Sequence, residues 1–237
     1  ELLLTPGAVR AALTWPHFSV TSFLMVRRLR LQGVVPATVI DVGANVGQFA
    51  VACARTFPAC RILSFEPGAE AFARLERHTR GLAVSCRNVA LGSSAGVLPV
   101  RRNRHSGASS FLPMTDYYRA RFPDLEEEQV EEVRVELLDA ALADEELVGP
   151  ILLKLDVQGF EKEVLAGGER TLSGCRWVLM ELSFHELYRG EETFVSMIDY
   201  MRERGFALDR LVDVLREPAR GEIVQADALF VPADGEG

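Results

Sequence analysis

Five polar residues each lie near the end of a short apolar run, where side chains could do chemistry. They are Asp41, Glu66, Asn88, Asp156 and Glu181. Ligands of a parallel sheet bind beyond the carboxyl ends of the strands, so we expect these side chains to converge on one crevice. Carboxylates in such a crevice could hold sugar hydroxyls, balance a cation or accept a proton.

A glycine-containing turn joins the first of these apolar runs to a helical segment. The sequence is Asp41-Val42-Gly43-Ala44-Asn45-Val46-Gly47. Gly43 and Gly47 would let the backbone approach a ligand closely, and the start of the next helix offers free N–H groups suited to a carboxylate. Asp41 and Asn45 strengthen this interpretation, because a polar residue ending a buried strand needs a partner or a cleft. We assign these four residues to a nucleotide-type cofactor site.

Glu66 follows the next apolar run, 19 residues after Gly47. Its two carboxylate oxygens could accept hydrogen bonds from the vicinal hydroxyls of a ribose. The alternative is a favourable charge at the start of the helix after Pro67, worth at most about 1 kcal/mol. We favour the ribose role. Asn88 closes the expected strand 83–89 and could bond to an adenine edge or to neighbouring backbone.

Apolar strands alternate with amphipathic helices from residue 37 onward, which predicts parallel pairing and right-handed crossovers. Strands are expected at 38–42, 61–66, 83–89, 151–155, 177–182, 206–215 and 228–231. Helices are expected at 46–56, 69–80, 160–172 and 192–204. Residues 91–150 interrupt this rhythm and are expected to form a hairpin and a surface excursion, with an acidic run at 124–132, a strand at 133–137 and a short helix within 138–147.

We expect two parts in the chain, an accessory segment over residues 1–36 and a catalytic domain over residues 37–237. A helix is expected at 19–32, with Val20, Phe23, Leu24 and Leu31 on its packing face. This segment would brace the main domain and could join two copies of the chain. Lys154 is one of only two lysines, and its side chain either extends to the surface or has a function.

Composition limits the classes of partner. A net charge of -8 argues against nucleic acid as a substrate, because phosphate binding needs a basic surface. No apolar run reaches the roughly 18 residues of a membrane span, and four cysteines without close pairs suggest reduced thiols and no zinc site. We therefore expect a cytoplasmic protein that acts on a small molecule, with no nucleic-acid or membrane partner.

The chain resembles the FkbM family of S-adenosylmethionine-dependent methyltransferases. The resemblance rests on residues 41–47, Phe65-Glu66-Pro67, residues 88–92, Ser109-Ser110, residues 155–161, Glu181 and residues 227–231. It implies an α/β class I methyltransferase fold, Rossmann-like, whose mostly parallel seven-stranded sheet has an antiparallel last strand. It also implies O-methylation of a small molecule such as a sugar or natural-product intermediate. Gln158 departs from the family, which often has glutamate there.

Methyl transfer to a hydroxyl requires removal of its proton, and four side chains are candidates for that step: Asp156, Glu181, His185 and His105. We prefer His185 as the general base, although a histidine in such a loop is often only a surface residue. Asp156 is assigned first to the methionine end of the cofactor and second to proton transfer. Ser110 could contact the cofactor, or it could only stabilise a local turn. Carboxylates could hold a divalent metal, but we do not predict one.

Two other functions are compatible with parts of the pattern. A nicotinamide-dependent oxidoreductase also uses a strand, a glycine turn and an acidic residue, but here Asn45 replaces the middle glycine and the third glycine is missing. A scaffold that binds S-adenosylmethionine without turnover is the other alternative, and the retained acidic positions argue against it.

Overall fold

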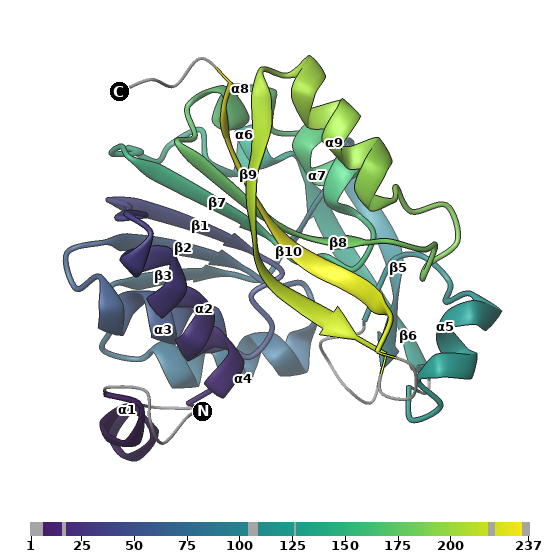
Figure 1. Cartoon of the computed structure of the whole chain (residues 1–237), viewed down its shortest axis with the longest axis horizontal. Coiled ribbons are helices and arrows are strands. Elements are labelled where there is room, and N and C mark those ends of the chain that lie inside the picture. Colours follow the sequence, from purple (N-terminus) through teal and green to yellow (C-terminus); the bar gives the residue numbers. More distant parts are fainter. Residues whose placement is uncertain (1–6, 16–17, 104–108, 126, 218–220, 234–237) are drawn as a thin grey trace.

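The computed structural model describes residues 7–15, 18–103, 109–125, 127–217 and 221–233. Its centre is a seven-stranded sheet (Figure 1). In spatial order the strands are β3 (Val84–Arg87), β2 (Arg61–Phe65), β1 (Thr38–Val42), β7 (Ile151–Leu155), β8 (Trp177–Ser183), β10 (Ile223–Pro232) and β9 (Phe206–Arg216).

Strand direction in this sheet follows the expectation from the family resemblance. Strands β3, β2, β1, β7 and β8 pair in parallel, whereas β10 runs antiparallel to both β8 and β9. All residues of β1 and β7 are buried, as expected for central strands covered on both faces. The prediction of a mostly parallel sheet with an antiparallel last strand is confirmed, because β10 is the last strand in the sequence.

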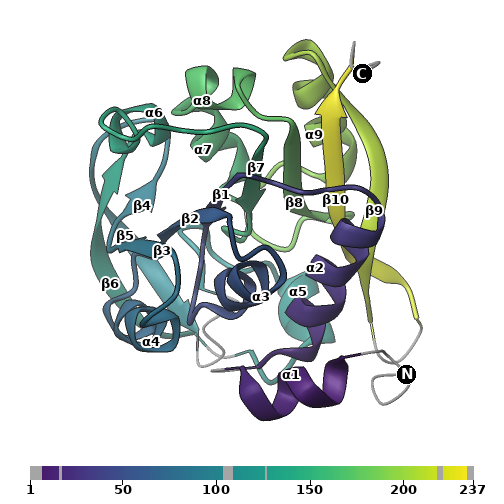
Figure 2. The ribbon, with the colours of Figure 1, turned by 90° about the vertical axis from the view of Figure 1, so that its left-hand side faces the viewer.

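Helices cover both faces of the sheet (Figure 2). One face carries α2 (Val20–Leu31), α3 (Gln48–Thr56) and α4 (Ala69–Thr79), with α1 (Ala8–Thr14) beside α2. The other face carries α6 (Leu138–Ala141), α7 (Glu161–Ala166), α8 (Glu169–Ser173) and α9 (Phe194–Glu203). Each layer buries its own apolar cluster against the sheet, so the strands are fixed from both sides.

A second, three-stranded sheet occupies much of the segment expected to be a hairpin and surface excursion. It contains β4 (Ala90–Leu91), β5 (Gly96–Asn103) and β6 (Glu127–Glu136), and α5 (Asp116–Arg121) lies between β5 and β6 in the sequence. The acidic run at 124–132 was expected to belong to the excursion, yet most of it lies in β6. Periodicity did not show this, because the residues of β6 up to Glu132 include few apolar side chains.

The expected helix 160–172 is interrupted, and α7 and α8 replace it. Gly167 is the C-cap of α7, and Gly168 is the N-cap of α8. A Cβ atom at Gly167 would lie 2.0 Å from the carbonyl oxygen of Gly92, and one at Gly168 would lie 2.5 Å from Leu138. The chain therefore bends where it passes close to the start of the second sheet and to α6.

The packing face predicted for the N-terminal helix is wrong in part. Phe23 is buried as expected, but Leu31 is 73% exposed, and Met25, Val26 and Leu29 face the interior. Apolar residues occur around much of α2, so the sequence alone does not define one face. No helix within the described ranges is both long and apolar enough to cross a membrane.

Candidate cofactor and catalytic site

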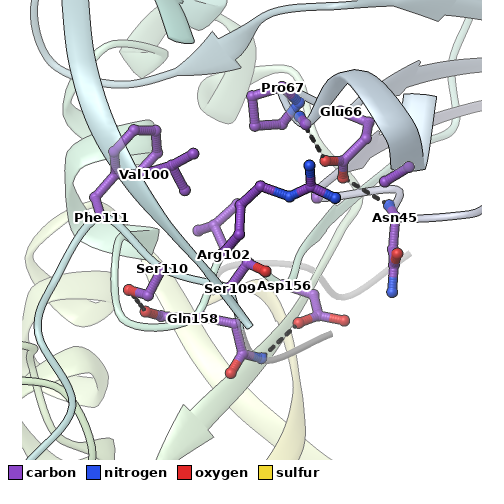
Figure 3. A pocket seen from close by; sticks show the side chains of 14 residues that line it. Asn45, Glu66, Pro67, Val100, Arg102, Ser109, Ser110, Phe111, Asp156 and Gln158 are labelled. Carbon is purple, nitrogen blue, oxygen red and sulfur yellow. Dashed lines mark hydrogen bonds between the residues drawn. The ribbon is translucent and has the colours of Figure 1, made fainter. Parts of the chain in front are cut away.

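A cavity of about 690 Å³, including open solvent at its mouth, lies at the carboxyl ends of β1, β2 and β7. Its lining residues are Gly43, Asn45, Glu66, Pro67, Gly68, Ala71, Val100, Arg102, Ser109, Ser110, Phe111, Asp156, Val157 and Gln158 (Figure 3). Loops at the edge of the first sheet supply one wall, and β5 with residues 109–111 supplies another.

Glu66 follows β2 and links two parts of the cavity wall. Its Oε2 accepts a hydrogen bond of 2.8 Å from the backbone N–H of Asn45, and its Oε1 accepts one of 2.8 Å from Gly68. Gly68 is the N-cap of α4. Glu66 therefore also makes a contact at the start of this helix, as the alternative interpretation of this residue predicts. Each carboxylate oxygen keeps a further acceptor site, which a diol could use. Burial raises the pKa of Glu66 to about 7.

The glycines of the turn after β1 make room for the protein itself. A Cβ atom at Gly43 would lie 1.9 Å from the carbonyl oxygen of Asp156, and one at Gly47 would lie 2.9 Å from Leu75. Asn45, in contrast, is directed to the cavity from a backbone with φ 49°, and its buried Oδ1 has no hydrogen-bond partner. Buried acceptors are normally satisfied, so this atom fits a donor group on a ligand.

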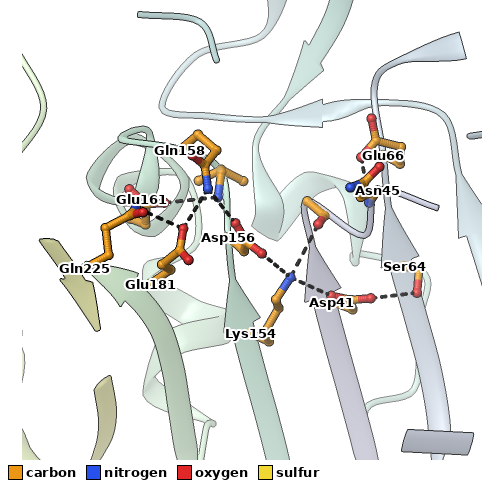
Figure 4. A network of polar contacts seen from close by, with 12 residues as sticks. Asp41, Asn45, Ser64, Glu66, Lys154, Asp156, Gln158, Glu161, Glu181 and Gln225 are labelled. Carbon is orange, nitrogen blue, oxygen red and sulfur yellow. Dashed lines mark hydrogen bonds and ion pairs between the residues drawn. The ribbon is translucent and has the colours of Figure 1, made fainter. Parts of the chain in front are cut away.

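Asp41 does not line the cavity, because it lies inside β1 and its side chain is fully buried beneath the turn. Its Oδ1 lies 3.3 Å from Lys154 Nζ, which is also 3.3 Å from Oδ2 of Asp156 (Figure 4). Burial by itself would lower the pKa of Lys154, but the two carboxylates raise it above its usual value. Lys154 is 7% exposed, so the surface-extended interpretation of this residue is wrong.

Asp156 follows β7 and faces the cavity, and its Oδ1 accepts a hydrogen bond of 2.9 Å from Gln158 Nε2. The same nitrogen donates to Glu181 Oε2 at 2.7 Å. Glu181 lies inside β8, outside the cavity lining, and borders a smaller hollow that also includes Asp227. Burial, with neighbouring carboxylates, raises the pKa of Glu181 well above its usual value.

Two of the other candidates differ in their relation to the cavity. Ser110 lines it, and its hydroxyl donates to the carbonyl oxygen of Gln158 at 2.6 Å. Asn88 does not line it, and its side-chain amide donates to the carbonyl oxygens of Glu66 and Pro67, both at 2.9 Å. Asn88 thus holds the loop that carries Glu66, and its contact with adenine stays a prediction.

The two histidine candidates are not placed at the cavity. His185 is exposed, its ring lies 5.0 Å from that of Tyr117, and it is absent from the cavity lining. His105 lies outside the described residues. The role of His185 as a general base therefore stays a prediction without geometric support from the cavity.

Sequence reasoning named no role at the site for three residues in or near the second sheet. Val100, Arg102 and Phe111 line the cavity, and Arg102 pairs with Glu70 at 3.0 Å and Glu131 at 3.5 Å. In the sequence, Arg102 is one of three closely spaced arginines, at positions 101, 102 and 104, and nothing in this pattern indicates a site. The two-residue spacing of Val100 and Arg102 in a strand could have placed them on one face, but not over this cavity.

These residues fit an adenosyl cofactor that carries a cation. Glu66 offers acceptors for a ribose diol, Asn45 has an unpaired acceptor, and Asp156 offers a carboxylate to positive charge. In the part of the chain that the structure describes, no three His, Cys, Asp or Glu side chains are grouped to hold a metal.

Comparison with known proteins gives a family match and several relatives. A family profile described as "Methyltransferase FkbM domain" matches residues 41–208. The 2-O-methyltransferase NoeI of Sinorhizobium fredii is 26% identical over 170 residues, covering 69% of this chain and 70% of that protein. Methyltransferase sdnD of Sordaria araneosa is 28% identical over 196 residues, covering 73% of this chain and 74% of that protein.

Among solved structures, precorrin-6y C5,15-methyltransferase from Geobacter metallireducens GS-15 is similar to the chain with a TM-score of 0.48 and 10% identity. The match covers 89% of this chain and 86% of that one. This likeness is too weak to indicate a shared substrate.

Proposed function

The chain belongs to the FkbM family of methyltransferases, and from this premise we propose that it uses S-adenosylmethionine to methylate a hydroxyl group of a small molecule, such as a sugar. One observation carries the cofactor assignment: Glu66, Asn45 and Asp156 face a single cavity. The hydroxyl acceptor is supported by the relative NoeI, which is named a 2-O-methyltransferase.

The cavity walls supply different kinds of contact for the cofactor. Glu66 would accept from the ribose hydroxyls, and the unpaired Oδ1 of Asn45 would accept from another donor. Val100 and Phe111 offer apolar surface for the purine. Asp156 would face the positively charged sulfonium end of the cofactor, because a carboxylate stabilises a positive charge close to it.

The bound cofactor supplies an electrophilic methyl group on a sulfonium centre. The chain must then align the acceptor oxygen with that methyl group and take the hydroxyl proton, and alignment supplies much of the rate. Asp156 is placed for this step, because its carboxylate faces the cavity whereas His185 does not line it, and Lys154 and Gln158 hold its orientation. We therefore prefer it to His185.

Titration calorimetry with S-adenosylmethionine and with a nicotinamide dinucleotide tests the cofactor. We expect binding of the first alone, and Glu66→Gln should weaken it at least tenfold, since a hydrogen bond to a charged acceptor contributes about 1.5–3 kcal/mol. Glu76→Gln, at an exposed position of α4, is the control and should bind as the wild type does.

Incubation with methyl-labelled S-adenosylmethionine and a panel of sugars and hydroxylated metabolites tests the reaction. We expect an O-methylated product. Cofactor binding without any product would favour the scaffold alternative, and tight nicotinamide binding without S-adenosylmethionine binding would reverse the assignment.

A further inference from the structure

Gln158 adopts a backbone conformation that is rare for its residue type. Its φ is 55°, in the left-handed region, where residues other than glycine are uncommon because their Cβ atom crowds the backbone. Gly159 follows with φ 93°, and a Cβ atom there would lie 2.9 Å from the side chain of Glu191. The turn between β7 and α7 thus directs the Gln158 side chain inward, and the residue is 7% exposed.

Every hydrogen-bonding group of the Gln158 side chain has a partner. Nε2 donates to Asp156 Oδ1 at 2.9 Å and to Glu181 Oε2 at 2.7 Å (Figure 4). Oε1 accepts from the hydroxyl of Tyr188 at 2.9 Å. Its backbone carbonyl accepts from Ser110. One amide therefore joins the cavity wall to β8 and to the loop after it.

The two carboxylates differ in what else holds them. Asp156 has Lys154 on its other oxygen, whereas Gln225 donates to the same Glu181 oxygen at 3.0 Å. Without the amide, the two acidic groups would face each other across the space that Nε2 occupies. Such a pair is relieved by turning a side chain away or by taking up a proton.

We propose that Gln158 is a positioning residue, whose amide holds the Asp156 carboxylate toward the cofactor cavity and keeps Glu181 behind the cavity wall. The inference rests on the proposed function in one respect, that Asp156 faces the cofactor's cation. A neutral amide bridges two carboxylates at any pH because it has two N–H donors. A carboxyl group in its place has one donor at most, and only when protonated.

Gln158→Glu and Gln158→Met separate this role from simple packing. Gln158 contacts Asp156, Glu181 and Tyr188 directly. The titratable groups that act on these three are Lys154 of β7, Asp227 of β10, Glu161 of α7, Tyr118 of α5 and Glu191 of the loop after β8. Acids dominate this set, so a glutamate at position 158 should retain its proton at about pH 6 and lose it toward about pH 8.5.

The measurement is the affinity for S-adenosylmethionine at these two pH values, by calorimetry. For Gln158→Glu we expect a dissociation constant within about threefold of wild type at the lower pH and at least about tenfold weaker at the higher pH. Gln158→Met should be at least about tenfold weaker at both. Gln32→Glu, an exposed site, should follow the wild type. Wild-type affinity in Gln158→Met, or a wild-type pH dependence in Gln158→Glu, would overturn the proposal.

A second readout needs no cofactor. The Gln158 side-chain N–H signals in the ¹H–¹⁵N spectrum, assigned by their loss in Gln158→Glu, should shift with pH as the bridged carboxyl groups titrate. Signals that do not respond to pH would contradict the bridge. A wild type that binds no S-adenosylmethionine would instead refute the proposed function, and the amide signals would still test the bridge.

Discussion

Lys154 determines the charge beneath the glycine turn. Its ammonium group lies between Asp41, which has no exposed surface, and Asp156. Two carboxylates this close to each other are tolerated because the cation between them offsets their repulsion. The set has one more negative than positive charge, and the carboxylate that reaches the cavity is that of Asp156. A buried ion pair thus supports the orientation of a side chain in the site.

Lys154→Met should lower the free energy of unfolding by about 3–5 kcal/mol, because removing one partner leaves a buried charge uncompensated. Urea denaturation at neutral pH measures this. The double variant Asp41→Asn with Lys154→Met should be more stable than the single variant, since the orphaned charge is gone.

Lys162 provides the matched control, because it is the other lysine and pairs with Glu192 at the surface. Lys162→Met should change stability by less than about 1 kcal/mol. Equal effects of the two lysine substitutions would refute the buried-pair explanation.

The break between α7 and α8 lies where the helices packed on the main sheet meet the start of the second sheet. Gly167 allows it, because only a residue without Cβ fits against the carbonyl oxygen of Gly92. Its φ is -84°, an ordinary value for any residue, so close packing and not backbone conformation selects glycine here. This contact helps to hold the second sheet, whose β5 lines the cavity.

Gly167→Ala should destabilise the protein by about 1–3 kcal/mol, as overpacking of a tight contact does. Thermal or urea unfolding checks it. Gly96→Ala, at a strand position with nothing within 4 Å of the added Cβ, should stay within about 0.5 kcal/mol of wild type. If Gly96→Ala lost as much stability as Gly167→Ala, close packing would not be the reason for glycine at position 167.

Across the whole molecule, four buried acids with raised pKa values lie in the loops after β2 and β8, at the start of α7 and within β10. Burial raises the pKa of Glu66, Glu191 and Asp227 to about 7 and that of Glu161 to about 8. In the unfolded chain the pKa values of these carboxyl groups are about 4. The folded state therefore binds more protons than the unfolded state between about pH 5 and pH 8. Their contribution to stability is full at low pH and is lost as pH rises through 7–8.

The free energy of unfolding should therefore fall by at least about 2 kcal/mol from about pH 6 to about pH 9, since one unit of pKa shift corresponds to about 1.4 kcal/mol. Urea titrations at several pH values measure the slope. Glu161→Gln replaces one of these acids by a side chain that cannot ionise. In this variant the decrease in the free energy of unfolding should be smaller by about 1–3 kcal/mol.

Glu132→Gln, at an exposed position of β6, should leave the slope unchanged. Asp139, whose pKa is lowered by hydrogen bonds from Thr171 and Arg170 despite partial burial, affects stability only near its own titration at low pH. Stability that rises between about pH 6 and pH 9 would contradict the assignment of the raised pKa values.

The sequence by itself determined the order of the strands of the main sheet, the glycine turn and the positions of Glu66 and Asp156. These features depend on local periodicity and on polar residues that come directly after a strand, where a side chain reaches the sheet edge. The family resemblance added the antiparallel last strand, which alternation alone would not predict.

Only the tertiary structure decided which polar residues face the cavity. Asp41 and Glu181 lie inside β1 and β8, so the alternation of side chains along a strand directs them to a face of the sheet and not to its edge. Arg102 and Gln158 acquire their places from partners more than twenty residues away in sequence, Glu70 and Glu181. The local sequence pattern does not predict such pairings, because they form only when elements distant in the sequence pack together.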